Sequence, residues 1–236
     1  MSRSIDMMKY LLIGIVSTGF IFTELPGEEG SWKSLFNGKD LTGWDGQAGA
    51  WEVKDGEIRC TGMSKGKNWL VWRGGEPGDF TLRMQFRWQE GNSGVQVRSD
   101  DLGEWQIFGY QVEIAERNKM GMWHHSLLDK THPKKEIRHL MTTAGQKAVI
   151  DASGKKTIAQ FADTAKVQSV YNEGEWNDLE IVARGPELVQ KINGVVFAEL
   201  IDDDTGMSRR EGLIALQDHG KGCQVAFRKI ELKITR

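Results

Sequence analysis

The chain has 236 residues, with 31 Lys and Arg against 33 Asp and Glu, and a formal net charge of −2. No basic or acidic block stands out, so the charge pattern gives no indication of nucleic-acid binding or of attachment to an anionic membrane, and we expect neither. The length suits one large β domain, and 28 glycines against 4 prolines indicate many turns.

The first 24 residues have the pattern of a targeting segment. Arg3 and Lys9 precede an apolar run over residues 10–22, which is short for a bilayer span but has the length of a signal-peptide core. We therefore expect residues 1–24 to be a signal peptide, the protein to be exported to the periplasm or the cell exterior, and residues 25–236 to form a single domain. An uncleaved N-terminal anchor is the alternative.

Short strands separated by Gly-rich turns follow one another along the rest of the chain. Asp55-Gly56 and Asn193-Gly194 mark tight turns between pairs of strands. The predicted strands include residues 69–72, 80–88, 95–98, 109–114, 176–184, 188–192, 195–200 and 225–234, together with a strand–turn–strand over residues 51–62 and a segment over residues 212–220. This spacing, without helical periodicity, predicts an all-β fold, an antiparallel β-sandwich.

Residues 80–98 hold the longest alternation in the chain. From Phe80 to Trp88 every second residue is apolar, the turn-forming cluster 91–94 follows, and residues 95–98 alternate again. This pattern predicts a hairpin, with one polar face formed by Arg83, Gln85, Arg87, Gln96 and Arg98. So many guanidinium and amide groups on one face indicate the floor of a site, the alternative being a solvated sheet surface.

A second alternating strand over residues 109–114 places Gln111 and Glu113 on one face and Tyr110, Val112 and Ile114 on the other. Residues 115–168 are less regular and contain four of the five histidines of the chain. We expect long loops with short strands there, where a sandwich usually carries its specificity.

Several motifs together resemble one known family, the 3-keto-disaccharide hydrolases. They are residues 35–44 (LFNGKDLTGW), Trp51 with Asp55-Gly56, Asn92-Ser93-Gly94 with Arg98, Trp176-Asn177, and residues 215–220 (ALQDHG) with 225–228 (VAFR). The resemblance runs from about Trp32 to Ile234. It implies a concanavalin A-like, laminin-G-like jelly roll and an exported bacterial protein acting on oxidised glycosides. Family members often carry Glu then Gln where this chain has Gln111 and Glu113, and Asn where it has Lys229.

The chemistry that this resemblance implies needs three kinds of group. A ketone at C3 of a sugar acidifies the proton at C2, and its loss lets the group at C1 leave by elimination, after which water can add. A base, a donor for the enolate oxygen and assistance to the leaving group are required. Our candidate catalytic residues are Glu113, His219 and Arg98. The candidate substrate-binding residues are Arg87, Gln96, Asn92, Gln111, Gln217, Trp123 and His124.

Each candidate also has a structural interpretation. Arg87 and Arg98 can bridge carboxylates across a sheet, Asn92 can serve only a turn, and His219 can shape a strand end. Of the neighbours His124 and His125, at most one enters a given site if they lie on a strand. Glu113 is the strongest candidate, because a carboxylate between apolar neighbours on an inner strand is costly to desolvate.

No cofactor is implied with certainty. A divalent metal ion held by Glu113 with His124, His125 or His219 is possible chemistry for polarising the ketone, although no tight ligand motif is present. Cys60 and Cys223 lie near opposite ends of the predicted domain, and one disulfide between them is an open alternative to two free thiols.

The expected function is cleavage of 3-keto-glycosides, small-molecule carbohydrates. The main alternative is a non-catalytic carbohydrate-binding module in which Trp105 and Trp123 stack on sugar rings. A laminin-G-like adhesion domain has less support because the chain carries no companion modules. Glycoside hydrolysis by two carboxylates has less support because no second carboxylate is clearly paired with Glu113.

Overall fold

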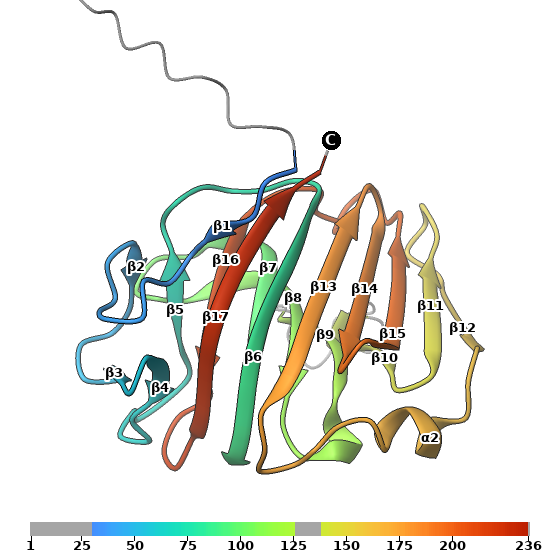
Figure 1. Ribbon diagram of the computed structural model, residues 1–236. Helices are drawn as coiled ribbons and strands as arrows, with labels where there is room; N and C mark the ends of the chain where they lie inside the picture. The colour runs from blue at the N-terminus through green and yellow to red at the C-terminus, as the bar shows by residue number, and fades with distance from the viewer. Residues whose placement is uncertain (1–29, 126–137, 236) are drawn as a thin grey trace, which may run out of the picture.

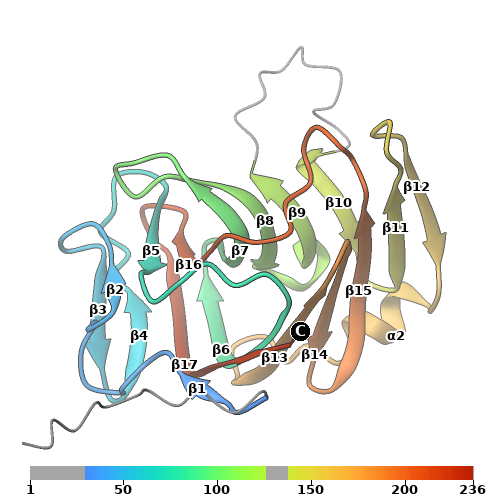
Figure 2. The ribbon, with the colours of Figure 1, turned by 90° about the horizontal axis from the view of Figure 1, so that it is seen from above.

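The computed structural model describes residues 30–125 and 138–235, so the predicted signal peptide lies outside the described residues. Almost all regular structure in these residues is β, and two sheets pack face to face (Figure 1; Figure 2). Within the described part of the chain, no helix has the length and apolar character needed to cross a membrane. The predicted all-β fold, an antiparallel β-sandwich of the concanavalin A-like jelly-roll type, is confirmed.

The ten-stranded sheet forms the front layer of Figure 1. Its neighbours are antiparallel except for one parallel pair, β11 with β15. In spatial order its strands are β12 (Lys156–Gln160), β11 (Gln146–Ile150), β15 (Val195–Asp202), β14 (Glu187–Ile192), β13 (Asn177–Arg184), β6 (Phe80–Glu90), β17 (Gln224–Ile234), β4 (Glu57–Cys60) and β3 (Trp51–Lys54), with β1 (Lys33–Ser34) paired to β17.

The seven-stranded sheet lies behind it, as the view from above shows (Figure 2). Its strands, in spatial order, are β10 (Leu140–Thr143), β9 (Gly121–His125), β8 (Ile107–Ile114), β7 (Ser93–Asp101), β16 (Leu213–Asp218), β5 (Asn68–Trp72) and β2 (Trp44–Asp45). The helical segments are short and include a 3-10 turn over Arg117–Lys119 and α2 (Thr164–Gln168).

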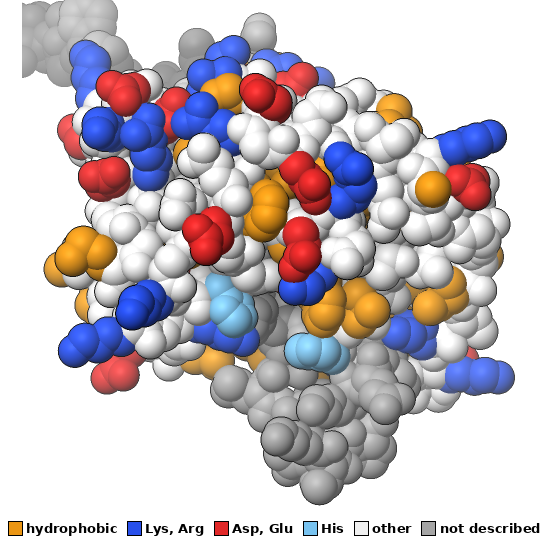
Figure 3. All heavy atoms as spheres, turned by 90° about the horizontal axis from the view of Figure 1, so that it is seen from below, with side chains coloured by type: hydrophobic (Ala, Val, Ile, Leu, Met, Phe, Trp, Pro, Cys, Tyr) orange, Lys and Arg blue, Asp and Glu red, His pale blue; other side chains and the backbone are white. Residues whose placement is uncertain are grey.

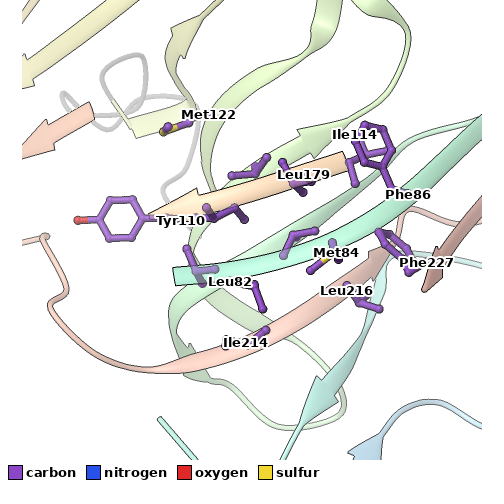
Figure 4. Close-up of a cluster of buried hydrophobic side chains, with 14 of the residues drawn as sticks. Leu82, Met84, Phe86, Tyr110, Ile114, Met122, Leu179, Ile214, Leu216 and Phe227 are labelled. Carbon is purple, nitrogen blue, oxygen red and sulfur yellow. The ribbon is translucent and has the colours of Figure 1, made fainter. Parts of the chain in front are cut away.

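The apolar faces of the two sheets meet in one core. Alternate residues of β6 point inward and meet inward-pointing side chains of β8 and β16 from the opposite sheet (Figure 4). Leu82, Phe86, Ile114 and Leu216 are all fully buried. The strand pattern read from the sequence is thus correct over most of the chain, including the turns at Asp55-Gly56 and Asn193-Gly194.

The predicted hairpin over residues 80–98 is wrong, and this changes the predicted site. β6 pairs with β13 and β17 in one sheet, whereas β7 pairs with β8 and β16 in the other. Residues 91–92 therefore cross between the layers. Because both strands turn their apolar sides to the shared core, their polar sides face away from each other. Arg87 and Gln96 consequently lie on opposite surfaces of the sandwich.

Candidate functional site

A cavity of about 330 Å³ lies on the outer face of the seven-stranded sheet, near the strand ends where residues 91–92 lead into β7. Histidine side chains lie among lysines and arginines on the surface at this end (Figure 3). We call this hollow the Glu113 cavity. It is lined by Lys67, Asn92, Gln111, Glu113, Lys119, Trp123, His124, His139 and His219.

Strand register brings the polar side chains of this face together. Gly94 of β7 lies between Glu113 of β8 and Gln217 of β16, so the last two share one face. Gln111, two residues before Glu113, lies on the same face. A Cβ on Gly94 would approach the Gln111 side chain to 2.6 Å, so glycine is what lets the Gln111 amide reach across the strand.

The Glu113 carboxylate is oriented by two amides. The Nδ2 of Asn92 donates a hydrogen bond to Oε1, and the Nε2 of Gln111 donates to Oε2 at 2.6 Å. The side chain is 7% exposed, and burial raises the pKa of Glu113 above its usual value. The two amides, with Lys67 and Lys119, act in the opposite direction on this pKa. Glu113 is therefore a held, accessible carboxylate with enhanced basicity.

A row of buried amides extends from Glu113 across the sheet. Besides Glu113, the Nε2 of Gln111 also bonds the Oε1 of Gln217, at 3.0 Å. Gln96 pairs with Gln111 and is completely buried, and neither polar atom of its side chain has a hydrogen-bond partner among the described residues. Gln111 thus borders the cavity directly, while Gln96 and Gln217 lie behind it in the sheet.

His219 forms another part of the cavity wall. It follows the last residue of β16, and its backbone N–H bonds the carbonyl of Asn92 at 3.3 Å, which joins two loops at the cavity edge. Its ring is exposed to the cavity side, and burial, followed by the charge of Lys67, lowers the pKa of His219. A neutral imidazole on the same cavity wall as Glu113 can accept a proton, and the imidazolium that forms can donate one.

Of the two neighbouring candidates on β9, the structure favours Trp123. Trp123 pairs with Gln111 and shares its face, with its ring edge-on to that of His139 at 4.9 Å between centroids. His124 borders the cavity but points to the other side of the sheet. It is 1% exposed, and its ring contacts those of Tyr110 and Phe108. Its predicted role in substrate binding stays a prediction, with only its place at the cavity border in favour.

Arg98 does not lie at the cavity. A register shift in β7 between Val97 and Asp100 puts Arg98 at φ +47°, and the side chain is 1% exposed. Its guanidinium donates to the carbonyls of Gly78 and Gly185 and to Asp79, at 3.1, 2.6 and 2.9 Å. The predicted catalytic role is replaced by a structural one, since Arg98 holds the loops at Gly78–Asp79 and Gly185 against β7. The bulge is what the alternation pattern did not reveal.

Arg87 also lies elsewhere, on the outer face of the ten-stranded sheet. Its guanidinium is 3.3 Å from the Glu57 carboxylate and stacks 4.7 Å from the centroid of the Trp176 ring. Arg87 therefore bridges to a carboxylate across the sheet, as its structural interpretation expected. It does not line the Glu113 cavity, so its predicted role in substrate binding is not supported. Trp105 is not among the residues that line the Glu113 cavity, and its indole N–H donates to Asp45 at 2.9 Å.

Three residues of the cavity were not among the predicted site residues: Lys67, Lys119 and His139. Lys67 lies in the loop before β5, and Lys119 in the 3-10 turn after β8. Loop lysines are common and carry no periodic signal, so no pattern in the chain distinguished these two from the others. His139 belongs to the His-rich segment 115–168, and that clustering of histidines was the sequence feature that indicated it.

The predicted ion at Glu113 stays a prediction. Glu113, His124 and His219 do not form a close group of three ligand atoms within the described residues, where such a group occurs only at Cys60, Asp218 and Cys223. The side chain of His125, a further predicted ligand, is outside what the structure describes. Both cysteines are buried free thiols, so the predicted alternative of a disulfide is not formed.

Over residues 31–233 the chain matches the profile of the 3-keto-alpha-glucoside-1,2-lyase-like domain. No curated protein matches this chain. The match covers every element that builds the Glu113 cavity.

Solved structures share the fold at low sequence identity. Two proteins from Parabacteroides distasonis, described as candidate glycosyl hydrolases, are 16% and 20% identical, with TM-scores of 0.56 and 0.55. The alignments cover 87% and 86% of this chain and 94% and 99% of theirs. The carbohydrate-binding module CBM66 from Bacillus subtilis is 13% identical, with a TM-score of 0.52, over 81% of this chain and 95% of the module. At these identities the likeness shows the fold alone.

Proposed function

Because the chain belongs to the family of 3-keto-alpha-glucoside-1,2-lyase-like domains, we propose that it is a carbohydrate-active enzyme that cleaves the glycosidic bond of 3-keto-glycosides. The observation that supports this most is Glu113, a buried carboxylate held by two amides at the wall of a cavity. A volume of about 330 Å³ lies at the lower end of the range for small-molecule sites, roughly 300–1,000 Å³.

In the proposed first step, Glu113 removes the proton at C2 of the ketosugar. The C–H electron pair forms the C2–C3 double bond of an enolate, and the negative charge moves to the C3 oxygen. Burial raises the pKa of Glu113, so the carboxylate is a stronger base than an exposed glutamate. Asn92 and Gln111 each engage one oxygen and so fix the direction of the remaining lone pairs.

The enolate needs positive charge or donors near the C3 oxygen. Lys67 and Lys119 line the same cavity and are close enough to lower the pKa of Glu113 through their charge. In this proposal one of these ammonium groups stabilises the enolate, as donors do in an oxyanion hole. They take the place that the sequence prediction had given to Arg98.

In the second step the enolate re-forms the ketone and expels the group at C1, which leaves a double bond between C1 and C2. Protonated His219, on the cavity wall, is the proposed donor of the proton that the leaving oxygen takes up. Water then adds across the new double bond: its hydroxyl goes to C1, its proton returns to His219, and the proton that Glu113 removed goes back to C2, which gives net hydrolysis. Trp123 is the proposed stacking surface for the sugar ring.

The test is incubation of the purified domain with 3-keto-trehalose, 3-keto-lactose and the unoxidised sugars in D2O, followed by NMR. Cleavage confined to the ketosugars, with deuterium incorporated at C2, is the expected result. Binding of the ketosugars with neither cleavage nor exchange would contradict the enzymatic proposal and favour the alternative, a carbohydrate-binding module.

Export belongs to the same proposal. The apolar run at residues 10–22, preceded by Arg3 and Lys9, supports a cleaved signal peptide and a location in the periplasm or outside the cell. N-terminal sequencing of the protein recovered from the periplasm or medium tests it. A mature chain that begins at Met1 would favour the uncleaved anchor.

A further inference from the structure

A second group of reactive side chains lies outside the Glu113 cavity, at one edge of the space between the two sheets. Cys60 ends β4, Cys223 immediately precedes β17, and Asp218 ends β16. The two thiols and a carboxylate oxygen lie within 4.8 Å of one another, and all three residues are buried. The group therefore joins the ten-stranded sheet to the seven-stranded sheet through three separate segments.

The Asp218 carboxylate is completely buried and rigidly held. Ser64 Oγ donates to its Oδ2, the Nδ2 of Asn68 lies 3.4 Å from the same oxygen, and the Gly220 N–H donates to Oδ1 at 2.9 Å. Asn68 is itself held by the indole N–H of Trp51 at 3.0 Å. All of these donors are neutral, so they orient the carboxylate but do not balance its charge.

A buried carboxylate beside two thiols is a costly arrangement unless a cation joins it. Two sulfur ligands and one carboxylate oxygen are a donor set that suits Zn²⁺, which takes Cys and Asp ligands in tetrahedral sites. The hydrogen bonds to Asp218 correspond to the outer contacts that orient ligating carboxylates in metal sites. A simple disulfide would account for the two sulfurs but not for the carboxylate held against them.

We propose that Cys60, Cys223 and Asp218 form a binding site for a thiophilic divalent metal ion, with Zn²⁺ as the best-fitting ion. On binding, the two S–H bonds break, two metal–sulfur bonds form, and two protons pass to solvent, with no change of oxidation state.

Two cavities border the site. Cys223 lines one of about 420 Å³ together with Asn92 and His219, and Cys60 lines another of about 180 Å³. The first is wide enough for water, which can supply a fourth ligand. The site does not depend on the proposed enzymatic activity.

The position of the site links it to the Glu113 cavity. The Cys223 sulfur lies 3.4 Å from the carbonyl oxygen of Asn92, whose side chain holds Glu113. Asp218 directly precedes His219. A bound ion would therefore fix the two loops that carry Asn92 and His219, which gives it a positioning role and no direct contact with substrate.

The test uses the purified full chain, reduced and stripped with a chelator under anaerobic conditions, and titrated with Co²⁺. We expect one equivalent to bind, with thiolate-to-cobalt charge-transfer absorption and the intense visible bands of a tetrahedral site, and Zn²⁺ to displace it. Cys60→Ser and Cys223→Ser should each weaken binding by more than about 100-fold, since changes to outer contacts alone cost about 10–100-fold.

Asp218→Asn should also weaken Co²⁺ binding. Its matched control is Asp151→Asn, because Asp151 is exposed and its side chain bonds only residues of its own turn. Circular dichroism of every variant checks folding, and metal content of the untreated wild-type chain gives a readout that needs no variant. A reduced wild-type chain that binds no Co²⁺ would overturn the proposal. The proposal would also be overturned if the native chain held a Cys60–Cys223 disulfide and the cobalt spectrum were unchanged in Cys223→Ser.

Discussion

Asn92 and Glu113 are joined by a hydrogen bond from the Asn92 amide to Oε1 of Glu113, although the residues are 21 positions apart. Asn92 belongs to the segment that crosses from one sheet to the other, and Glu113 lies near the end of β8. The crossing thus does two things. It connects the layers of the sandwich, and it orients the candidate base.

Removing this contact should alter the titration of Glu113. Asn92→Ala deletes a donor that lowers the pKa of Glu113, so the pKa should rise further and the acidic limb of kcat/KM should move to higher pH. The measurement is the pH profile of ketosugar cleavage. Asn37→Ala, in an exposed turn, is the control and should leave the profile unchanged. If the acidic limb of Asn92→Ala were not shifted, the hydrogen bond from Asn92 would not influence the pKa of the catalytic base.

Glu113→Gln should separate binding from turnover. Loss of the base should lower kcat by about 10²–10⁴-fold, the usual contribution of general base catalysis. The Kd for a 3-keto-glycoside should change by less than about tenfold, or about 1.4 kcal/mol, because the cavity keeps its shape. Kinetics and calorimetry on the same preparation measure both. Undiminished turnover in the variant would remove Glu113 from the mechanism.

The wild-type pH dependence has a defined sign. Burial raises the pKa of Glu113 above 4.5, and only the ionised form acts as a base. The activity should therefore fall as the pH drops through this raised pKa, at a higher pH than an exposed glutamate would give. Rates of C2 deuterium exchange across the acidic range test this. A flat profile through that range would contradict the assignment.

Lys67 and Lys119 should act on the same limb through their charge. Both lower the pKa of Glu113, so Lys67→Met or Lys119→Met should shift the acidic limb upward and lower kcat if the ammonium stabilises the enolate. Lys65→Met, an exposed lysine two residues from Lys67 and outside the cavity lining, is the matched control. Because the side chains are exposed, added salt should reduce the shift. Equal effects in Lys65→Met would point to net charge alone.

Substitution of Arg98 should destabilise the fold more than substitution of Arg87, and neither should change catalysis directly. Arg98→Met leaves Asp79 without its buried partner and two carbonyls without donors, which should cost about 3 kcal/mol of unfolding free energy. Arg87→Met loses only partly exposed contacts and should cost less than about 1 kcal/mol. Urea unfolding measures both. A large loss of kcat in folded Arg98→Met, with stability retained, would return Arg98 to the site.

Much of the site was visible in the sequence because burial in a strand follows a period of two. That period alone put Gln111 and Glu113 on the face opposite Val112, as the structure confirms. The position of His219 just after an apolar strand was equally local information. These predictions needed only the alternation of one strand at a time.

The sequence by itself determined the sandwich, most of its strands and the outward direction of Glu113, since these depend on local alternation and turn residues. Only the tertiary structure decided that β6 and β7 belong to different sheets, that a bulge buries Arg98, and that Lys67 lies beside Glu113. The physical reason is that alternation specifies which side chains are buried but not which strand pairs with which. Pairing depends on how all the apolar faces are buried together, and that is a property of the whole chain.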